Sequence, residues 1–237
     1  MLPTQAYLNN DEDKQFFCYN HVMPELTIKD FGIIDYTRCL DLQHQLVEQR
    51  QQGLIGNTVL IVEHPSVITL GARDDKNRLL ADKSKLSSES IEVVPIRRGG
   101  GATAHNPGQL VFYPIIDIKP IGVSEYVRML ESIGIDLLNA FGVSSDRRHG
   151  FPGLWIGERK IASIGVKIQK WVSFHGMAIN INNDLEIFEN IVPCGLDGVV
   201  MTSASAILGR ELDMDSVKAE LKRILIEYFS QKKQENK

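Results

Sequence analysis

Apolar residues recur at a helical spacing near 3.6 in three segments of the chain, covering residues 35–53, 124–141 and 216–229. This spacing predicts amphipathic helices, with Asp35 and Ser124 as N-caps of the first two and Gly53 as the end of the first. The apolar stripes consist of Tyr36, Cys39, Leu40, Leu46 and Val47, then Val127, Leu130, Ile133, Leu137, Leu138 and Phe141, then Val217, Leu221, Ile224, Leu225 and Tyr228.

Shorter runs rich in β-branched and aromatic residues separate these helices and predict strands. The runs cover residues 26–34, 58–62, 67–70, 91–96, 109–118, 154–156, 160–168 and 172–181. Pro114 interrupts one run, which predicts an edge strand or an irregular one. Tight turns are expected at 157–159 and near Lys170. The order of elements predicts an α/β (α+β) fold, with a mixed sheet flanked by about three main helices.

The composition fits one catalytic domain over residues 1–237, with a core at about 24–230 and loosely ordered termini. The chain has 237 residues, of which 43% are hydrophobic, enough to build a sizeable core. A net charge of -4 argues against a nucleic-acid partner. No apolar run reaches the length of a membrane span. Three widely spaced cysteines and an acidic start without targeting character predict a cytoplasmic protein with free thiols.

A polar loop with three successive glycines lies between two predicted strands, at Arg97 to Gln109. Glycines let a ligand approach the backbone closely, and we expect Arg98 and His105 to add donors at the rim. The loop lacks the Gly-Lys-Ser/Thr of a P-loop and the spacing of a dinucleotide site. A plain glycine-rich connection is the alternative interpretation.

Lys160 and Cys194 are candidate catalytic residues, although each has a simpler interpretation alone. Lys160 begins an apolar strand and is either desolvated inside the fold or a surface lysine past a turn. Cys194 follows Pro193 on a turn and is either a nucleophile or a small buried apolar residue. If they meet, an ammonium stabilises a thiolate, and the lysine can move protons for it.

His175 is an alternative base for a Cys-His pair, although a lone strand histidine is more often structural. The His, Cys and Asp residues are too scattered for a metal site readable from sequence, so no metal is expected.

From about Thr58 to Leu208, the chain resembles the lipoyl(octanoyl) transferases. The resemblance rests on an ordered set of short motifs rather than on any one of them. The motifs are Glu63-His64-Pro65, Thr69-Leu70-Gly71, Arg98-Gly99-Gly100, Thr103, His105, Pro107 to Val111, Tyr113-Pro114, Gly153-Leu154-Trp155, Lys160-Ile161-Ala162, Ile164-Gly165, His175-Gly176, Ala178, Asn180, Pro193-Cys194-Gly195 and Thr202-Ser203.

The resemblance implies a fold similar to the catalytic domain of biotin and lipoate protein ligases. It implies that Cys194 carries an acyl thioester and that Lys160 lowers the pKa of its thiol. It also implies three substrate-binding segments that hold the acyl group. Their residues are Arg98, Gly99, Gly100, Gly101, Ala102, Thr103, Ala104 and His105, then Ser163, Ile164 and Gly165, then Gly176, Met177 and Ala178.

The implied reaction moves an octanoyl or lipoyl group from acyl carrier protein to a lysine of a lipoyl domain, as the first step of endogenous lipoate biosynthesis. The acceptors are the lipoyl domains of 2-oxoacid dehydrogenases and the glycine cleavage H protein. No cofactor is expected, and the chain is expected to act as a monomer. A basic stretch between Arg147 and Lys170, with Arg147 and Arg148 at its start, is a candidate docking surface for an acidic carrier.

Three other functions remain open at this point. One is a generic thioesterase, although an enzyme that keeps its acyl group must exclude water. An ATP-dependent lipoate-protein ligase has a similar glycine loop but needs no nucleophilic cysteine. A non-catalytic protein that binds acyl carrier or lipoyl domains would keep the pocket and tolerate Cys194→Ser. The Lys160 and Cys194 pair favours the transferase.

Overall fold

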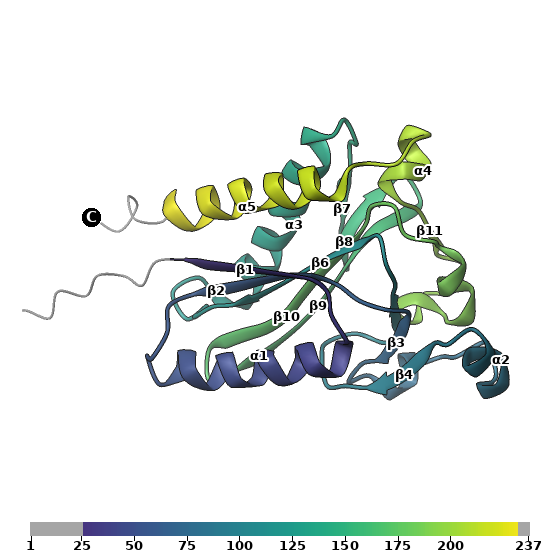
Figure 1. The fold of residues 1–237 in the computed structure, drawn as a ribbon, viewed down its shortest axis with the longest axis horizontal. Coiled ribbons are helices and arrows are strands. Elements are labelled where there is room, and N and C mark those ends of the chain that lie inside the picture. Colours follow the sequence, from purple (N-terminus) through teal and green to yellow (C-terminus); the bar gives the residue numbers. More distant parts are fainter. Residues whose placement is uncertain (1–25, 232–237) are drawn as a thin grey trace, which may run out of the picture.

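An eight-stranded sheet and a smaller three-stranded sheet form the framework of the molecule (Figure 1). The computed structural model describes residues 26–231, with the side chains of that range except those of Cys194, Ser230 and Gln231. The predictions for the terminal residues before 26 and after 231 fall outside the described residues.

The large sheet is mixed, as predicted. Its spatial order is β1 (Thr27–Ile33), β2 (Thr58–Glu63), β6 (Gln109–Ile115), β10 (Val172–Asn180), β9 (Arg159–Gln169), β8 (Phe151–Ile156) and β7 (Asp146–Arg148), with β11 (Val200–Met201) also paired to β9. The β1–β2 and β9–β11 pairs are parallel, and the other pairs are antiparallel.

The small sheet has the order β4 (Glu92–Pro95), β3 (Val67–Leu70) and β5 (Thr103–His105). The main helices are α1 (Tyr36–Gln51), α3 (Gly122–Ala140) and α5 (Met214–Gln231), with shorter α2 (Lys83–Ser88) and α4 (Ala204–Leu208). Three 3-10 turns complete the described elements: η1 (Asp74–Lys76), η2 (Glu186–Asn190) and η3 (Pro193–Gly195). The strand within the glycine loop, β5, was not predicted as a separate element.

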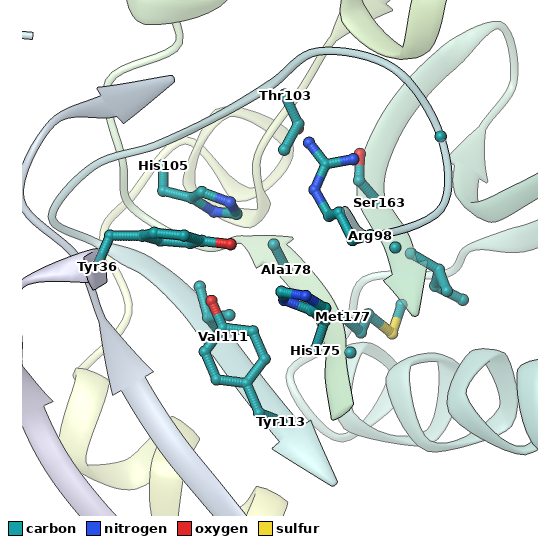
Figure 2. A pocket seen from close by; sticks show the side chains of 14 residues that line it. Tyr36, Arg98, Thr103, His105, Val111, Tyr113, Ser163, His175, Met177 and Ala178 are labelled. Atoms are coloured by element: carbon teal, nitrogen blue, oxygen red, sulfur yellow. The ribbon is translucent and has the colours of Figure 1, made fainter. Parts of the chain in front are cut away.

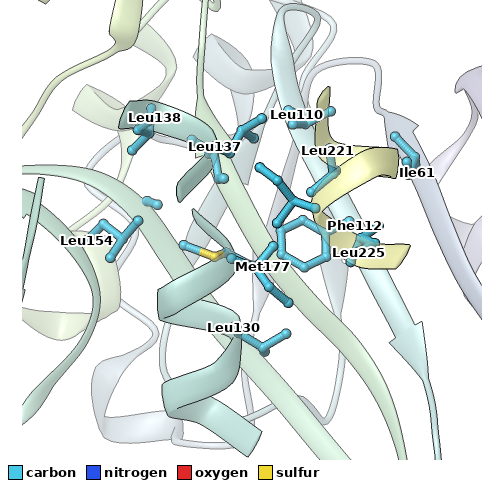
Figure 3. Packing of buried hydrophobic residues seen from close by; sticks show 14 of the residues in the cluster. Ile61, Leu110, Phe112, Leu130, Leu137, Leu138, Leu154, Met177, Leu221 and Leu225 are labelled. Carbon is cyan, nitrogen blue, oxygen red and sulfur yellow. The ribbon is translucent and has the colours of Figure 1, made fainter. Parts of the chain in front are cut away.

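The three main helices cover both faces of the large sheet (Figure 1). α3 and α5 pack on one face, where the apolar stripes of both helices meet the sheet around Phe112 and Met177 (Figure 3). α1 packs on the opposite face through Cys39, Leu46 and Val47. The predicted stripes therefore point into the core as their spacing indicated.

Asp35 is the N-cap of α1, since its carboxylate accepts the Arg38 N–H at 2.8 Å. The predicted cap of α3 is wrong, because α3 begins at Gly122 and Ser124 lies inside its first turn. The carbonyl of Ile118 accepts the N–H groups of Ile121 and Gly122, so the chain is already turned before Ser124.

Pro114 lies in a central strand, so the prediction of an edge strand is wrong, whereas the predicted irregularity is confirmed. β6 lies between β2 and β10, but its pairing with β10 stops at Phe112–Met177 and returns only at the Asp117–Val172 bridge. Pro114 has no N–H to donate to the ladder. Ser173 fills part of the gap by donating its hydroxyl to the Pro114 carbonyl at 2.8 Å.

Candidate active site

A pocket of about 430 Å³ opens between the glycine loop, α1 and the central strands β6, β9 and β10 (Figure 2). Its lining residues are Tyr36, Arg98, Gly100, Thr103, His105, Val111, Tyr113, Ser163, Ile164, Gly165, His175, Gly176, Met177 and Ala178.

Most of the residues expected to bind the acyl group line this pocket. They come from all three predicted segments: Arg98, Gly100, Thr103 and His105, then Ser163, Ile164 and Gly165, then Gly176, Met177 and Ala178. The antiparallel pairing of β9 with β10 brings the last two segments together, with Gly165 opposite Gly176.

Gly99, Gly101, Ala102 and Ala104 do not line the pocket. The Gly99 N–H donates to the Val166 carbonyl at 3.0 Å, which fastens the loop to β9. A Cβ on Gly101 would lie 2.3 Å from the Lys76 carbonyl oxygen, so only glycine fits there. Ala102 and Ala104 are fully buried in a separate apolar cluster under the small sheet. These four residues shape the loop from behind the pocket.

Arg98 lies inside the loop, with an exposed fraction of 6%, and not at the pocket rim as expected. Its guanidinium donates to the carbonyls of Gly99 and Gly101 and to the hydroxyl and carbonyl oxygens of Thr69. A Cβ on Gly165 would lie 2.7 Å from Arg98 Cδ, so the glycine lets Arg98 cross β9. Arg98 therefore holds the loop in a fixed shape beside the pocket.

The sequence did not identify four of the lining residues as pocket residues, namely Tyr36, Val111, Tyr113 and His175. Tyr36 was assigned to the core because it belongs to the apolar stripe of α1. Its ring stacks on His105 with a centroid separation of 5.7 Å. An apolar stripe does not reveal which of its members faces a cavity, so only the contact between α1 and β5 identifies Tyr36.

Three buried histidines surround the pocket, and burial lowers the pKa of each ring. The pKa falls to about 4 for His64 and to about 3 for His105 and His175, with Arg98 as a further cause at both of the latter. His64 Nδ1 must donate to the Ile34 carbonyl, so its Nε2 accepts the Tyr113 hydroxyl at 2.8 Å. The pocket wall is therefore polar but uncharged at the histidines.

His175 has an unusual backbone, with a φ of 54°, because it faces Pro114 in the gap of the β6–β10 ladder. Its N–H donates to Gln43 Oε1 of α1 at 2.8 Å instead of to the sheet. Its Nδ1 is buried and has no hydrogen-bond partner among the described residues. Gly176 beside it leaves room for Phe112 and Pro114, since a Cβ would lie 2.1 Å from the Phe112 carbonyl oxygen. Pro114 thus shapes this wall of the pocket.

Lys160 points into the fold and is 2% exposed, so the interpretation as a surface lysine is wrong. Its Nζ donates to the Pro152 carbonyl at 3.1 Å and lies 5.1 Å from the centre of the Trp155 ring. A buried ammonium needs such partners. A Cβ on Gly153 would approach Lys160 Cε to 3.0 Å, so the glycine keeps space for the lysine.

The residue Cys194 is the middle of the 3-10 turn η3, and its side chain lies outside the described part of the structure. η3 contacts β5, and a Cβ on Gly195 would lie 2.6 Å from Lys76 Cβ. The chain after η3 returns to β9 as β11, where Met201 pairs with Lys160 and the Thr202 N–H donates to the Lys160 carbonyl. The fold thus brings the Cys194 turn to β5 of the glycine loop, and it brings the segment that follows the turn to β9 at Lys160.

Arg147 and Arg148, predicted together as a docking surface, differ in their surroundings. Arg147 pairs with the buried carboxylate of Glu131 on α3 at 3.1 Å and donates to Ser132. Arg148 lies over the rings of Phe151 and Trp155 and pairs with the exposed Glu158. Arg147 therefore fastens β7 to α3, and only Arg148 lies beside the Lys160 region.

Among the described side chains, no three His, Cys, Asp or Glu residues gather closely enough to hold a metal ion. No helix within residues 26–231 combines the length and the apolar character needed to cross a membrane.

The fold is similar to that of solved lipoate and biotin protein ligases. The structure is similar to a putative lipoate protein ligase from T. acidophilum with bound lipoic acid, with a TM-score of 0.68, 16% identity and coverage of 87% of this chain and 86% of that one. It is also similar to a biotin protein ligase from Aquifex aeolicus, with a TM-score of 0.50, 13% identity and coverage of 90% and 73%. These likenesses confirm the predicted fold class.

Residues 35–226 match the model of the lipoyl protein ligase A/B catalytic domain, and the chain belongs to this family. An octanoyltransferase from Syntrophobacter fumaroxidans is 43% identical over 190 residues, which cover 79% of this chain and 83% of that protein. A second octanoyltransferase, from Solibacter usitatus, is 43% identical over 197 residues, covering 82% and 89%. The predicted resemblance is confirmed.

Proposed function

We propose that this chain is an octanoyltransferase of lipoate biosynthesis that works through a covalent acyl-enzyme. The octanoyl group comes from acyl carrier protein, forms a thioester with Cys194 and passes to a lysine of a lipoyl domain. The octanoyltransferases that are 43% identical to the chain support the activity. The burial of Lys160 supports the mechanism, because its side chain points into the fold from β9, the strand that pairs with β11 just after the Cys194 turn.

In the first half-reaction, Cys194 reacts as a thiolate while Lys160 carries the proton, and its sulfur attacks the thioester carbonyl of the donor and forms a carbon–sulfur bond. The bond to the donor sulfur breaks, and the donor leaves as a free thiol after taking a proton from Lys160 Nζ. The acyl chain lies in the pocket, where Ile164 and Met177 offer apolar contacts.

In the second half-reaction, the amine of the acceptor lysine attacks the acyl-enzyme carbonyl. An amide bond forms, the Cys194 sulfur leaves, and Lys160 accepts the proton that the amine loses. Transfer of the acyl group from one thioester to another changes the free energy little, and transfer from a thioester to an amide releases free energy. The cycle therefore needs no ATP. The buried neutral histidines help this chemistry, because they place no charge beside an apolar chain.

The acceptors in this proposal are lipoyl domains of 2-oxoacid dehydrogenases and the glycine cleavage H protein. One structural neighbour is an archaeal bipartite lipoate protein ligase described with its E2 lipoyl domain. We further propose one catalytic domain, a monomer, and a cytoplasmic location, the last resting on the cysteine usage of the sequence.

Intact-protein mass spectrometry tests the proposal. The purified chain is mixed with octanoyl-acyl carrier protein without ATP, and a lipoyl domain is then added. The parent should gain one octanoyl mass and transfer it to the lipoyl domain. Cys194→Ser should gain none, and Lys160→Met should acylate slowly.

Cys39→Ser is the matched control for the cysteine. Cys39 is fully buried, and burial raises the pKa of its thiol to about 12, so this thiol stays protonated. The control should acylate as the parent does. Transfer that requires ATP and free octanoate, with no adduct at any stage, would instead identify a ligase.

A further inference from the structure

The η3 turn lies between the candidate acyl pocket and a solvent-exposed groove. On one side, η3 contacts β5, whose Thr103 lines the acyl pocket. On the other side, Gly195 lines a groove of about 830 Å³, together with Phe151 and Trp155 of β8. Phe151 and Val200 of this groove are 38% and 59% exposed, so the groove is open to solvent.

A thioester donor also has two parts on either side of its carbonyl. With the carbonyl at Cys194 and the acyl chain in the pocket, the sulfur-bearing arm must leave along an open path. The groove that begins at Gly195 supplies that path.

The groove has the side chains that a long anionic arm needs. Phe151, which is 38% exposed, and Trp155, which is only 2% exposed, form an aromatic wall, and the Arg148 guanidinium covers it at 5.3 and 4.9 Å from their ring centres. The exposed Arg159 stands on the same wall. Guanidinium groups bind phosphate oxygens in pairs, and aromatic faces pack against methyl and amide groups. Arg148 also pairs with Glu158 at 3.0 Å, but that carboxylate is 87% exposed, so the pair is weak.

Charge distinguishes this groove from its neighbour. Residues 196–200 form a ridge shared with a second groove, whose other walls carry Asp184, Glu186 and Glu189. The one arginine of the second groove, Arg78, is already paired with Asp197 of the ridge at 2.6 Å. The proposed groove has two arginines, Arg148 and Arg159, against two acids, Glu158 and Asp197, so it lacks the acidic excess of the second groove and repels a phosphate less.

We propose that the groove between β8 and residues 195–200 binds the phosphopantetheine arm of the donor, with Arg148 and Arg159 at its phosphate. This inference rests on the proposed function, because only a carrier-bound thioester brings such an arm. The chemistry recognised is a phosphate on an amide-containing chain that ends in a thioester.

Two small donors test the groove without the carrier protein: octanoyl-phosphopantetheine and octanoyl-pantetheine, which differ only in the phosphate. The acylation rate of the parent chain is measured by intact mass at low salt. The parent should react about 10-fold faster with the phosphorylated donor, as expected for one or two charge-assisted hydrogen bonds. The double variant Arg148→Ala/Arg159→Ala should lose this preference, so that the ratio of its rates with the two donors falls to about 1, whatever its rate with octanoyl-pantetheine.

Three control variants keep the test specific. Arg38→Ala removes one arginine from the exposed side of α1 and should keep the preference. Glu186→Gln/Glu189→Gln changes the second groove and should also keep it. Arg148→Lys retains the charge and should restore most of the preference.

The failure of the inference differs from the failure of the proposed function. Acylation by octanoyl-acyl carrier protein, with no phosphate preference or with a preference that survives the double variant, overturns the groove assignment alone. No acylation of Cys194 by any of the three donors overturns the proposed function and the groove with it.

Discussion

Lowering the pH from 7 to 5 is expected to destabilise the protein by roughly 5 kcal/mol, because three histidines around the pocket are buried without charge. The pKa is about 4 for His64 and about 3 for His105 and His175 in the folded chain, against 6.5 for a free ring. At a pH between the folded and the free pKa values, each ring therefore takes up a proton when the chain unfolds. The stability that a neutral ring contributes is complete above pH 6.5 and is lost as the pH falls toward the folded pKa.

The magnitude follows from the number of protons taken up. One proton changes the free energy of unfolding by about 1.4 kcal/mol per pH unit, so three rings give a slope of roughly 4 kcal/mol per pH unit near pH 5. The rings of His64 and His105 are 5.7 Å apart, so protonating one in the fold opposes protonating the other. A loss of this size is comparable to the whole stability of a typical domain, about 5–15 kcal/mol.

Urea denaturation followed by tryptophan fluorescence between pH 5 and pH 8 measures the slope. His105→Gln should lower the slope by one proton, about 1.4 kcal/mol per pH unit, whatever it does to stability at pH 8. His149→Gln is the matched control, since it makes the same exchange at an exposed side chain and leaves all three buried rings in place. The assignment of buried neutral rings would be refuted by a parent slope below about 1.4 kcal/mol per pH unit, which corresponds to one proton. A His105→Gln slope equal to that of the parent would refute it as well.

Three further predictions concern a buried ion pair, the close contact at Gly176 and the length of acyl chain that the pocket accepts. Lys218→Met should cost about 3–5 kcal/mol in urea denaturation, because it leaves the buried Glu63 carboxylate without its cation at 2.7 Å, and adding Glu63→Gln should recover part of the loss. Gly176→Ala should lower the free energy of unfolding by at least about 1–3 kcal/mol, because its Cβ would lie 2.1 Å from the Phe112 carbonyl oxygen. Gly99→Ala, whose nearest contact would be at 3.2 Å, should lower it less, and equal losses would contradict the geometry. In Gly134→Ala, the new Cβ would lie 2.7 Å from Met177 Cε and should push this flexible side chain toward the pocket. We expect the acylation rate with hexanoyl donors to rise relative to that with octanoyl donors. An unchanged ratio would show that Met177 does not limit the pocket.

The main elements could be predicted from the sequence because their signals are local. The apolar stripes of α1, α3 and α5 and the β-branched runs of β2, β9 and β10 are periodic over enough residues to be unambiguous. The start of α3 could not be placed, because the turn that precedes it is closed by the backbone carbonyl of Ile118. The short strands β5, β7 and β11 have too few residues to show a period.

For the site, the sequence alone determined which residues are candidates: a glycine loop, a lysine at the head of an apolar strand, a cysteine on a turn, and the ordered motifs of a family. The tertiary structure decided which of them meet. In the folded chain, Lys160 points inward, and Ala102 and Ala104 lie behind the pocket in a separate apolar cluster. Tyr36 and His175 reach the pocket from two other elements. It also separated Arg147 from Arg148, since one side chain meets a buried carboxylate and the other an aromatic wall. These outcomes depend on contacts between residues far apart in the chain, and no periodicity within a single segment records them.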